Sequence, residues 1–336
     1  MTITIKDVAD AAGVSTATVS RALRGLPNVD AGTRERIERI AADLDYVISP
    51  SASRLASGRT GSIAVITPHV ARWYFATVLS GVESVLQSAG IDLLLMSVSS
   101  SDGQHRLPPA PRLRRRVDGA LVIALSREDP QLHDVLALGL PTSLIGLTMP
   151  GVPSVTIDDV LAGRMAAQHL INLGHERIGV ITGASVGAPF TAPNDRYLGF
   201  EAAMNDAGLE IDPRLAHHGY FTMTGGEQAM TALLTQRHPP TAVFAMSDEM
   251  AFGALRAMRS HGLQPGEDIS IVGIDGHDMS ELLDLSTVAQ PVVDLGRSAA
   301  EALLLQLKDP GTDTPHEEIR MPTRLIVRGS TRPRSA

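Results

Sequence analysis

Seven short apolar runs alternate with stretches of helical periodicity from residue 62 to about residue 307. The runs are 63–66, 91–96, 120–125, 143–145, 178–181, 242–245 and 269–274, and the helical stretches lie near 74–88, 129–139, 160–173, 196–207, 225–236, 248–262 and 292–307. Strand–helix alternation with nearly continuous apolar strands is typical of parallel sheets covered by helices on both faces. About 270 residues of this pattern predict two similar α/β lobes, with a ligand site at the carboxyl ends of the strands.

The first 48 residues are expected to form three short helices. Thr4 and Asp7 have the spacing of a capping box, in which the Thr4 hydroxyl accepts the Asp7 backbone N–H and the Asp7 carboxylate reaches back. Gly13 can adopt the left-handed conformation that ends a helix, and Ser15 is a good N-cap for the next one. A third helix follows Asp30. The apolar positions that should face one another are Val8, Ala9, Ala12, Val19, Ala22, Leu23, Ile37, Ile40, Ala41 and Leu44.

The second of these helices has two interpretations. Its outer face carries Thr16, Ala17, Ser20, Arg21 and Arg24. Two short helices joined by a tight glycine turn, the second with a small, polar and basic face, have the form of a helix-turn-helix that binds DNA. In an ordinary helical hairpin the same face would merely be solvated, and the spacing alone does not separate the two interpretations.

The charge of the chain is unevenly distributed between its two parts. The net charge is −8, but residues 1–60 carry eight basic and seven acidic side chains, so the remainder carries about −9. An acidic body is repelled by phosphate, so contact with a nucleic acid would be confined to the N-terminal part.

A polar connector follows the three helices. Ser49 can cap a helix, Pro50 suits its first position and Gly58 can end it, which predicts one or two helical turns. A helix this short is marginal in water without a partner or DNA. Leu55 is a large apolar residue in the middle of this connector with no core beneath it.

Several classes of protein are excluded by what the sequence lacks. There is no cysteine, which excludes disulfides and thiolate chemistry, no signal-peptide pattern at the start and no apolar run long enough to span a membrane. We therefore expect a cytoplasmic protein with no membrane contact. Residues 183–187 fit the G-x-S-x-G pattern of a nucleophile elbow, but that pattern demands a helix directly afterwards, which APFTAPND cannot start cleanly. His175-Glu176 lacks the second histidine of a zinc motif. We expect no enzyme activity, no metal and no cofactor.

Taken in order, the motifs resemble the lactose-repressor (LacI/GalR) family of bacterial transcription factors. They are TIKDVADAAGVSTATVSRALRG and TRERIERIAADLDYV near the start, then RTGSIAVI, RRVDGALVI, HLINLGHERIGVITG, DRYLGFEAAMNDAGL, MSDEMAFGALRAMRSHGL and DISIVGIDG over some 300 residues. The resemblance implies an all-α helix-turn-helix headpiece (1–48), a hinge helix (49–60) and a two-lobed periplasmic-binding-protein-like core (61–336). Its N-lobe would comprise about 61–160 and 290–320, and its C-lobe about 161–289 and the C-terminal segment.

The resemblance also implies a homodimer, possibly a tetramer, that binds a pseudo-palindromic double-stranded operator. The recognition helix would start at Ser15, and Leu55 would wedge into the minor groove. The small side chains of Thr16 and Ala17 favour contacts to thymine methyl groups. The full set expected at DNA is Thr4, Ser15, Thr16, Ala17, Thr18, Ser20, Arg21, Arg34, Ser53 and Leu55. Two positions depart from the family: Ile48 replaces its usual proline and Ser53 its usual arginine, so the hinge contacts are expected to differ in detail.

The effector site expected from the resemblance combines hydrogen-bonding and aromatic side chains. Its members are Trp73, Tyr74, Phe75, Arg196, Phe221, Ser247, Asp248 and Asp275. Two alternatives stay open, since the rings of Trp73 and Phe75 could be part of the core and Asp248 could be the N-cap of the helix it precedes. Three prolines in QHRLPPAPRLRRR also predict that the helix there is short or starts only near Arg112, with Arg114, Arg115 and Arg116 on a solvated face.

These features predict a repressor of carbohydrate-utilisation genes that leaves its operator when a sugar-type effector binds. A corepressor-dependent repressor or an activator that responds to a non-sugar metabolite is the alternative. A secreted sugar-binding protein is excluded because the headpiece is present and a signal peptide is missing.

Overall fold

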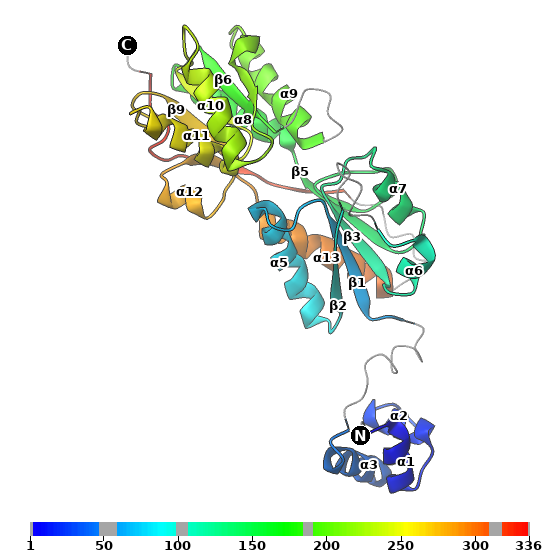
Figure 1. Ribbon diagram of the computed structural model, residues 1–336. Helices are drawn as coiled ribbons and strands as arrows, with labels where there is room; N and C mark the ends of the chain where they lie inside the picture. Colours follow the sequence, from blue (N-terminus) through cyan, green and yellow to red (C-terminus); the bar gives the residue numbers. More distant parts are fainter. Residues whose placement is uncertain (1–2, 47–58, 99–106, 184–190, 309–317, 335–336) are drawn as a thin grey trace. The chain divides into compact units, whose positions relative to one another are not determined.

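The computed structural model describes residues 3–46, 59–98, 107–183, 191–308 and 318–334 (Figure 1). The chain divides into two compact units, Met1–Gly61 and Ser62–Ala336.

The first unit is a bundle of three short helices, as predicted. They are α1 (Ile5–Ala12), α2 (Thr16–Leu23) and α3 (Ala31–Asp43). Gly13 ends α1 with φ +65°, and the Ser15 hydroxyl accepts the Thr18 backbone N–H at 3.1 Å. Thr4 and Asp7 form the predicted capping box: the Thr4 backbone N–H donates to the Asp7 carboxylate at 2.8 Å, and the Thr4 hydroxyl also donates to that carboxylate at 2.7 Å.

The core of this unit is made by the predicted faces of the three helices. The fully buried side chains are Val8, Ala9, Ala12, Val19, Ala22, Ile37 and Ala41. Leu23, Ile40 and Leu44 pack against this cluster but are only half-buried. The helical periodicity of the sequence therefore predicts the residues that form this core.

The second unit consists of two lobes, each built on a six-stranded sheet. The strands are β1 (Ser62–Thr67), β2 (Asp92–Ser97), β3 (Gly119–Ile123), β4 (Thr142–Ile145), β5 (Ser154–Ile157), β6 (Ile178–Thr182), β7 (Ala216–His218), β8 (Ala242–Ala245), β9 (Ser270–Asp275), β10 (Ser286–Ala289), β11 (Glu318–Met321) and β12 (Arg324–Ile326). Their order is β11-β5-β4-β3-β1-β2 in the first lobe and β12-β10-β9-β8-β6-β7 in the second. All neighbours are parallel except β10 and β12, which confirms the predicted parallel architecture.

Helices flank these sheets, and all of them except the short helix at Met279–Leu282 were predicted. They are α5 (Trp73–Ser88), α6 (Ala110–Arg114), α7 (Pro130–Leu136), α8 (Asp159–Asn172), α9 (Thr191–Asp206), α10 (Met223–Leu234), α11 (Asp248–Ser260), α12 (Met279–Leu282) and α13 (Val292–Lys308), with a 3₁₀ turn at Pro213–Leu215. As predicted, α6 is short: only Leu113 is buried, and the arginines on either side of it are exposed. Among the described residues, no helix is long and apolar enough to cross a membrane.

The segment that follows residue 190 differs from our expectation. We judged that APFTAPND could not start a helix cleanly, yet α9 begins within it, at Thr191. Pro193 is tolerated there because the N–H groups of the first helical turn have no partner in the helix. Residues 184–187 of the G-x-S-x-G match lie outside the described residues, so the absence of a helix start no longer counts against that match.

The chain passes between the lobes three times. The crossings join β5 to α8, β10 to α13 and β11 to β12, so that α13 returns to the first lobe and lies beside α5 (Figure 1). These crossings place the ends of both sheets around a common space between the lobes, which is lined by residues of both.

Glycines bring three pairs of helices into backbone contact. At each of six glycines an added Cβ would overlap with a backbone carbonyl oxygen of the partner helix. They are Gly81 and Gly296 between α5 and α13, Gly163 and Gly199 between α8 and α9, and Gly226 and Gly253 between α10 and α11. No other residue fits at these crossings without moving a helix.

Candidate functional site

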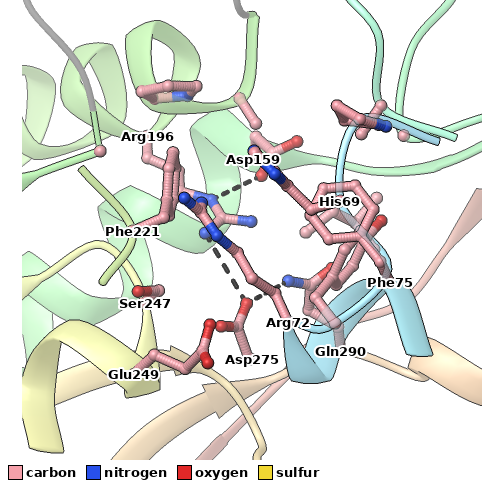
Figure 2. A pocket seen from close by; sticks show the side chains of 18 of the residues that line it. His69, Arg72, Phe75, Asp159, Arg196, Phe221, Ser247, Glu249, Asp275 and Gln290 are labelled. Atoms are coloured by element: carbon pink, nitrogen blue, oxygen red, sulfur yellow. Dashed lines mark hydrogen bonds and ion pairs between the residues drawn. The ribbon is translucent and has the colours of Figure 1, made fainter. Parts of the chain in front are cut away.

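A cavity of about 310 Å³ lies between the two lobes of the second unit (Figure 2). Nearly every residue that lines it lies at or just beyond the carboxyl end of a strand, where parallel α/β sheets bind their ligands. The polar and aromatic members are His69, Arg72, Tyr74, Phe75, Asp159, Arg196, Tyr220, Phe221, Ser247, Glu249, Asp275 and Gln290. The structure therefore brings Tyr74, Phe75, Arg196, Phe221, Ser247 and Asp275 together as predicted.

Arg196 occupies the centre of the polar part of the cavity. It extends from α9, is buried, and donates through Nε to Asp159 at 2.7 Å and through Nη1 to the Met246 carbonyl. The same Nη1 lies 3.8 Å from Asp275 Oδ1. Burial opposes the charge of Arg196, but the carboxylates of Asp159 and Asp275 outweigh it and raise its pKa. The guanidinium is thus a fixed cation at every physiological pH.

Asp275 ends β9 in an unusual backbone conformation. Its φ of +139° is rare for any residue other than glycine, and such conformations cluster at binding sites. The Gln290 side chain donates to Asp275 Oδ1 at 2.7 Å. Burial, reinforced by the negative charge of Asp248, raises the pKa of Asp275 to about 8, although Arg196 opposes the shift. Asp275 therefore exchanges a proton near neutral pH.

Aromatic rings from both lobes form the other part of the cavity. Tyr74 and Phe75 come from the first turn of α5 and contact each other edge to face, with centroids 5.3 Å apart. Phe221 comes from the loop after β7 at φ +55°, and its ring covers Gly183 so closely that a Cβ there would overlap with it. Rings such as these can cover the C–H face of a sugar.

Two predicted effector residues do not line the cavity. Trp73 turns away from it, stacks on His277 with centroids 4.5 Å apart and donates through Nε1 to Asp278 at 3.2 Å. It connects the lobes beside the cavity and packs, partly buried, against the hydrophobic core, as the core alternative predicts.

Asp248 also lies outside the cavity, because its carboxylate is used by the protein. It is fully buried and accepts four hydrogen bonds of 2.8–3.0 Å from the backbone N–H groups of Gly276 and His277 and the hydroxyls of Ser280 and Thr287. The alternative that Asp248 is the N-cap is wrong too, since Ser247 caps α11 by accepting the Met250 backbone N–H at 3.2 Å. Ser247, which does line the cavity, stays in the predicted set.

Several lining residues were not predicted from the sequence. Asp159 lies two residues after β5 and Gln290 directly after β10, two strands that we did not predict because their serines and threonines interrupt the apolar pattern. His69, Arg72 and Glu249 follow predicted strands, and their position after the strand was the signal that could have found them. Among the described residues, no group of side chains could hold a metal ion.

The predicted DNA-contacting face lies on and beside α2. Ser15, Thr16, Ala17 and Arg21 are exposed, as is Thr4, whereas Thr18 and Ser20 are half-buried. Arg24 does not point outward as we expected: it folds back and donates to the Ser20 carbonyl at 2.9 Å and to its hydroxyl at 2.8 Å. Arg34 reaches from α3 to the Leu26 carbonyl at 2.8 Å and holds the connecting loop.

The exposed cation that remains on α2 is Arg21, which no side-chain contact holds in the described part of the unit. Ser53 and Leu55 lie outside the described residues.

Comparison with known proteins gives matches over the whole chain. Residues 4–49 match the lacI family of bacterial regulatory proteins, and residues 167–331 match the periplasmic binding protein-like domain. The HTH-type transcriptional repressor CytR of Escherichia coli (strain K12) is 34% identical over 98% of this chain and 96% of its own length.

Two solved structures extend the likeness to the fold. The transcriptional regulator CelR in complex with cellobiose has a TM-score of 0.69 and 32% identity over 98% of this chain and 99% of that one. The Lac repressor dimer bound to operator and the anti-inducer ONPF has a TM-score of 0.85 and 25% identity over 99% and 100%. The chain therefore belongs to the lacI family of bacterial regulatory proteins and is a transcriptional regulator with an N-terminal helix-turn-helix DNA-binding unit.

Proposed function

We propose that this regulator is a cytoplasmic repressor that binds a pseudo-palindromic operator as a homodimer. A small polyhydroxylated, sugar-type effector that enters the cavity releases it from the operator. The observation that carries this proposal is the buried cluster of Arg196, Asp159, Asp275 and Gln290 facing aromatic rings in a cavity of about 310 Å³.

The chemistry of this cluster suits a polyhydroxylated ligand. A guanidinium has several donors in a fixed plane, a carboxylate accepts hydrogen bonds and the glutamine amide does both, so neighbouring hydroxyl groups can be bound in pairs. The rings of Phe75 and Phe221 supply the apolar surface that covers the C–H groups of a sugar ring. The cellobiose bound by CelR, a relative in fold and sequence, agrees with this class of ligand.

The DNA-binding part of the proposal rests on the exposed face of α2. Thr16, Ala17 and Arg21 are exposed side by side on it and remain the proposed base- and phosphate-contacting residues. Thr4, Ser15, Thr18, Ser20 and Arg34 are proposed to contact or position the phosphate backbone, and Ser53 and Leu55 to contact the minor groove.

Two experiments, followed by duplex binding with and without the ligand, test both halves of the proposal. The full-length protein selects binding sequences from a pool of randomised DNA duplexes, and a thermal-shift screen against sugars and sugar derivatives identifies ligands. A ligand at 100 times its dissociation constant stabilises the folded protein by about 2.7 kcal/mol. We expect recovery of a palindromic duplex and loss of duplex binding when the ligand is added. A ligand that strengthens duplex binding would instead establish the corepressor alternative, and failure to enrich any duplex would refute the proposal.

Effector affinity is expected to rise with pH between about 6 and 8 and to level off above that. Asp275, with its pKa near 8, is largely protonated at pH 6, whereas the ionised form is the better acceptor for ligand hydroxyls. Binding therefore releases a proton, and affinity increases by up to about tenfold per pH unit. Calorimetric titrations at several pH values measure the slope, and Asp275→Asn should remove it; a flat profile in the wild type would contradict this role.

Leu55→Ala is expected to weaken operator binding by at least about tenfold and to leave effector binding unchanged. An inserted apolar side chain offsets part of the free energy that unstacking a base step costs, and alanine is too short to do so. Duplex titrations measure the first effect and thermal shifts with the ligand the second. Unchanged operator affinity would refute the assignment of residues 49–60 as a hinge helix.

A further inference from the structure

Arg72 is a cation of the cavity that the protein leaves without a hydrogen-bonding partner. It directly precedes α5 in the first lobe, and Figure 2 shows its side chain extending from the start of that helix into the cavity, toward Arg196 of the second lobe. The side chain is half-buried. Within the described residues, no side chain or backbone group forms a hydrogen bond or ion pair with its guanidinium.

The other strongly charged groups that line the cavity have partners. Arg196 is balanced by Asp159 and Asp275, and Asp275 also accepts from Gln290. Glu249, on α11, accepts the backbone N–H of Trp73 and is the acidic group whose charge acts on Arg72, but the two do not form an ion pair. Arg196 is therefore held by an ion pair and hydrogen bonds, whereas Arg72 has an acidic neighbour, Glu249, but no described group that holds its guanidinium.

The pKa shifts of Arg72 and His69 agree with a guanidinium that has no hydrogen-bonding partner. Burial lowers the pKa of Arg72, and Glu249 opposes the shift only in part. Burial lowers the pKa of His69 as well, and the positive charge of Arg72 lowers it further. A bound ligand would displace solvent from the guanidinium, so the ligand itself must provide the hydrogen-bond acceptor. Carboxylates and phosphates match the planar fork of a guanidinium with two parallel hydrogen bonds.

We propose that Arg72 determines specificity by selecting an effector that carries a carboxylate or phosphate group on its polyhydroxylated body. The hydroxyl groups bind to Arg196, Asp275 and Gln290, and the anionic oxygens bind to Arg72 at the side of the first lobe. This inference rests on the proposed sugar-type function and narrows it from neutral sugars to their acidic derivatives.

The chain contains its own reporter for this test. Trp73 is the single tryptophan of the sequence, it follows Arg72 directly, and it stacks on His277 beside the cavity. Tryptophan fluorescence of the full chain is recorded during titration with inorganic phosphate and with acetate. We expect a saturable change with at least one of them, with a dissociation constant on the order of millimolar. The change should be absent in Arg72→Gln and retained in Arg237→Gln, a matched loss of one exposed arginine on the second lobe.

A second measurement uses matched sugars and distinguishes a carboxylate from a phosphate as the anionic group of the effector. Glucose, glucuronate, glucose 6-phosphate and glucosamine, and the corresponding ribose series, are titrated calorimetrically. The acidic member that fits is expected to bind roughly 10- to 100-fold more tightly than its neutral parent, as for hydrogen bonds to a charged group, and Arg72→Gln should abolish the preference. Preference for the carboxylate or for the phosphate series identifies the group.

The inference is overturned if neither anion gives a saturable, Arg72-dependent change, or if neutral or amino sugars bind as tightly as the acids. Both results would leave the proposed function standing, provided that some ligand still releases the protein from its selected duplex. If neutral and acidic ligands alike bind without releasing it, the proposed function itself has failed.

Discussion

Arg196→Ala is expected to give a protein that still binds its operator but no longer responds to its effector, with effector affinity reduced at least about 100-fold. The guanidinium is the only described group that bridges Asp159, Asp275 and the Met246 carbonyl, so its loss removes a ligand contact and the alignment of both carboxylates. Truncating one partner of a buried charged pair costs about 3–5 kcal/mol. The carboxylates can take up protons, because burial already raises the pKa of Asp159 and Asp275, and this limits the damage to the fold.

Calorimetry with the identified effector and duplex titrations with and without it measure this result. Arg196→Lys is expected to recover little, since an ammonium cannot contact both carboxylates in one plane. Arg164→Ala on α8 is the matched control: this arginine pairs with Asp206 at 2.6 Å on the surface, where ion pairs contribute little. Normal induction in Arg196→Ala would move the effector site elsewhere.

Asp248→Ala is expected to destabilise the second unit by about 3–5 kcal/mol without any direct effect on the ligand. Four donors converge on this buried carboxylate, and alanine would leave the His277 N–H and two hydroxyls without this acceptor, and the Gly276 N–H with only its longer hydrogen bond to the Thr287 hydroxyl at 3.3 Å. Asp248→Asn is expected to cost clearly less. Its remaining oxygen can keep the three donors at Oδ2, and the Thr287 hydroxyl can turn to accept from the new amide.

Urea unfolding followed by the fluorescence of Trp73 reports on this unit specifically, because the helix-turn-helix unit contains no tryptophan. The midpoint should fall strongly in Asp248→Ala and moderately in Asp248→Asn. Equal destabilisation by both variants would show that the negative charge, and not the set of hydrogen bonds, holds the loop after β9 in place.

The parts of the structure that follow from local periodicity could be predicted from the sequence. The helical spacing and the caps at Gly13 and Ser15 define the first unit, and seven apolar runs define seven strands. Strands β5 and β10 were not predicted because they contain buried hydroxyl groups, whose hydrogen-bonding partners come from distant parts of the chain. The Ser286 hydroxyl, for example, forms a hydrogen bond with the Thr331 hydroxyl. Asp159 and Gln290 were missed with those strands, although both touch the centre of the site.

Two residues that we expected in the cavity do not line it, because their side chains are oriented by partners distant in the sequence. Asp248 and Trp73 lie within two residues of true lining residues, so the sequence placed them in the right region. Which way each side chain turns depends on partners distant in sequence: Thr287 and Gly276 for Asp248, and His277 and Asp278 for Trp73. Arg24 turned inward for a local reason, since Ser20 lies one helical turn before it.

The six glycines at the helix crossings determine how this unit can change shape. Helices whose backbones touch cannot slide past one another without a clash, so α5 with α13, α8 with α9 and α10 with α11 each behave as one solid piece. The chain crosses between the lobes at three short segments, after β5, β10 and β11, which lie outside these close-packed pairs. In the proposed function, an effector that contacts Arg196 in one lobe and Phe75 in the other would act on the angle between the two lobes.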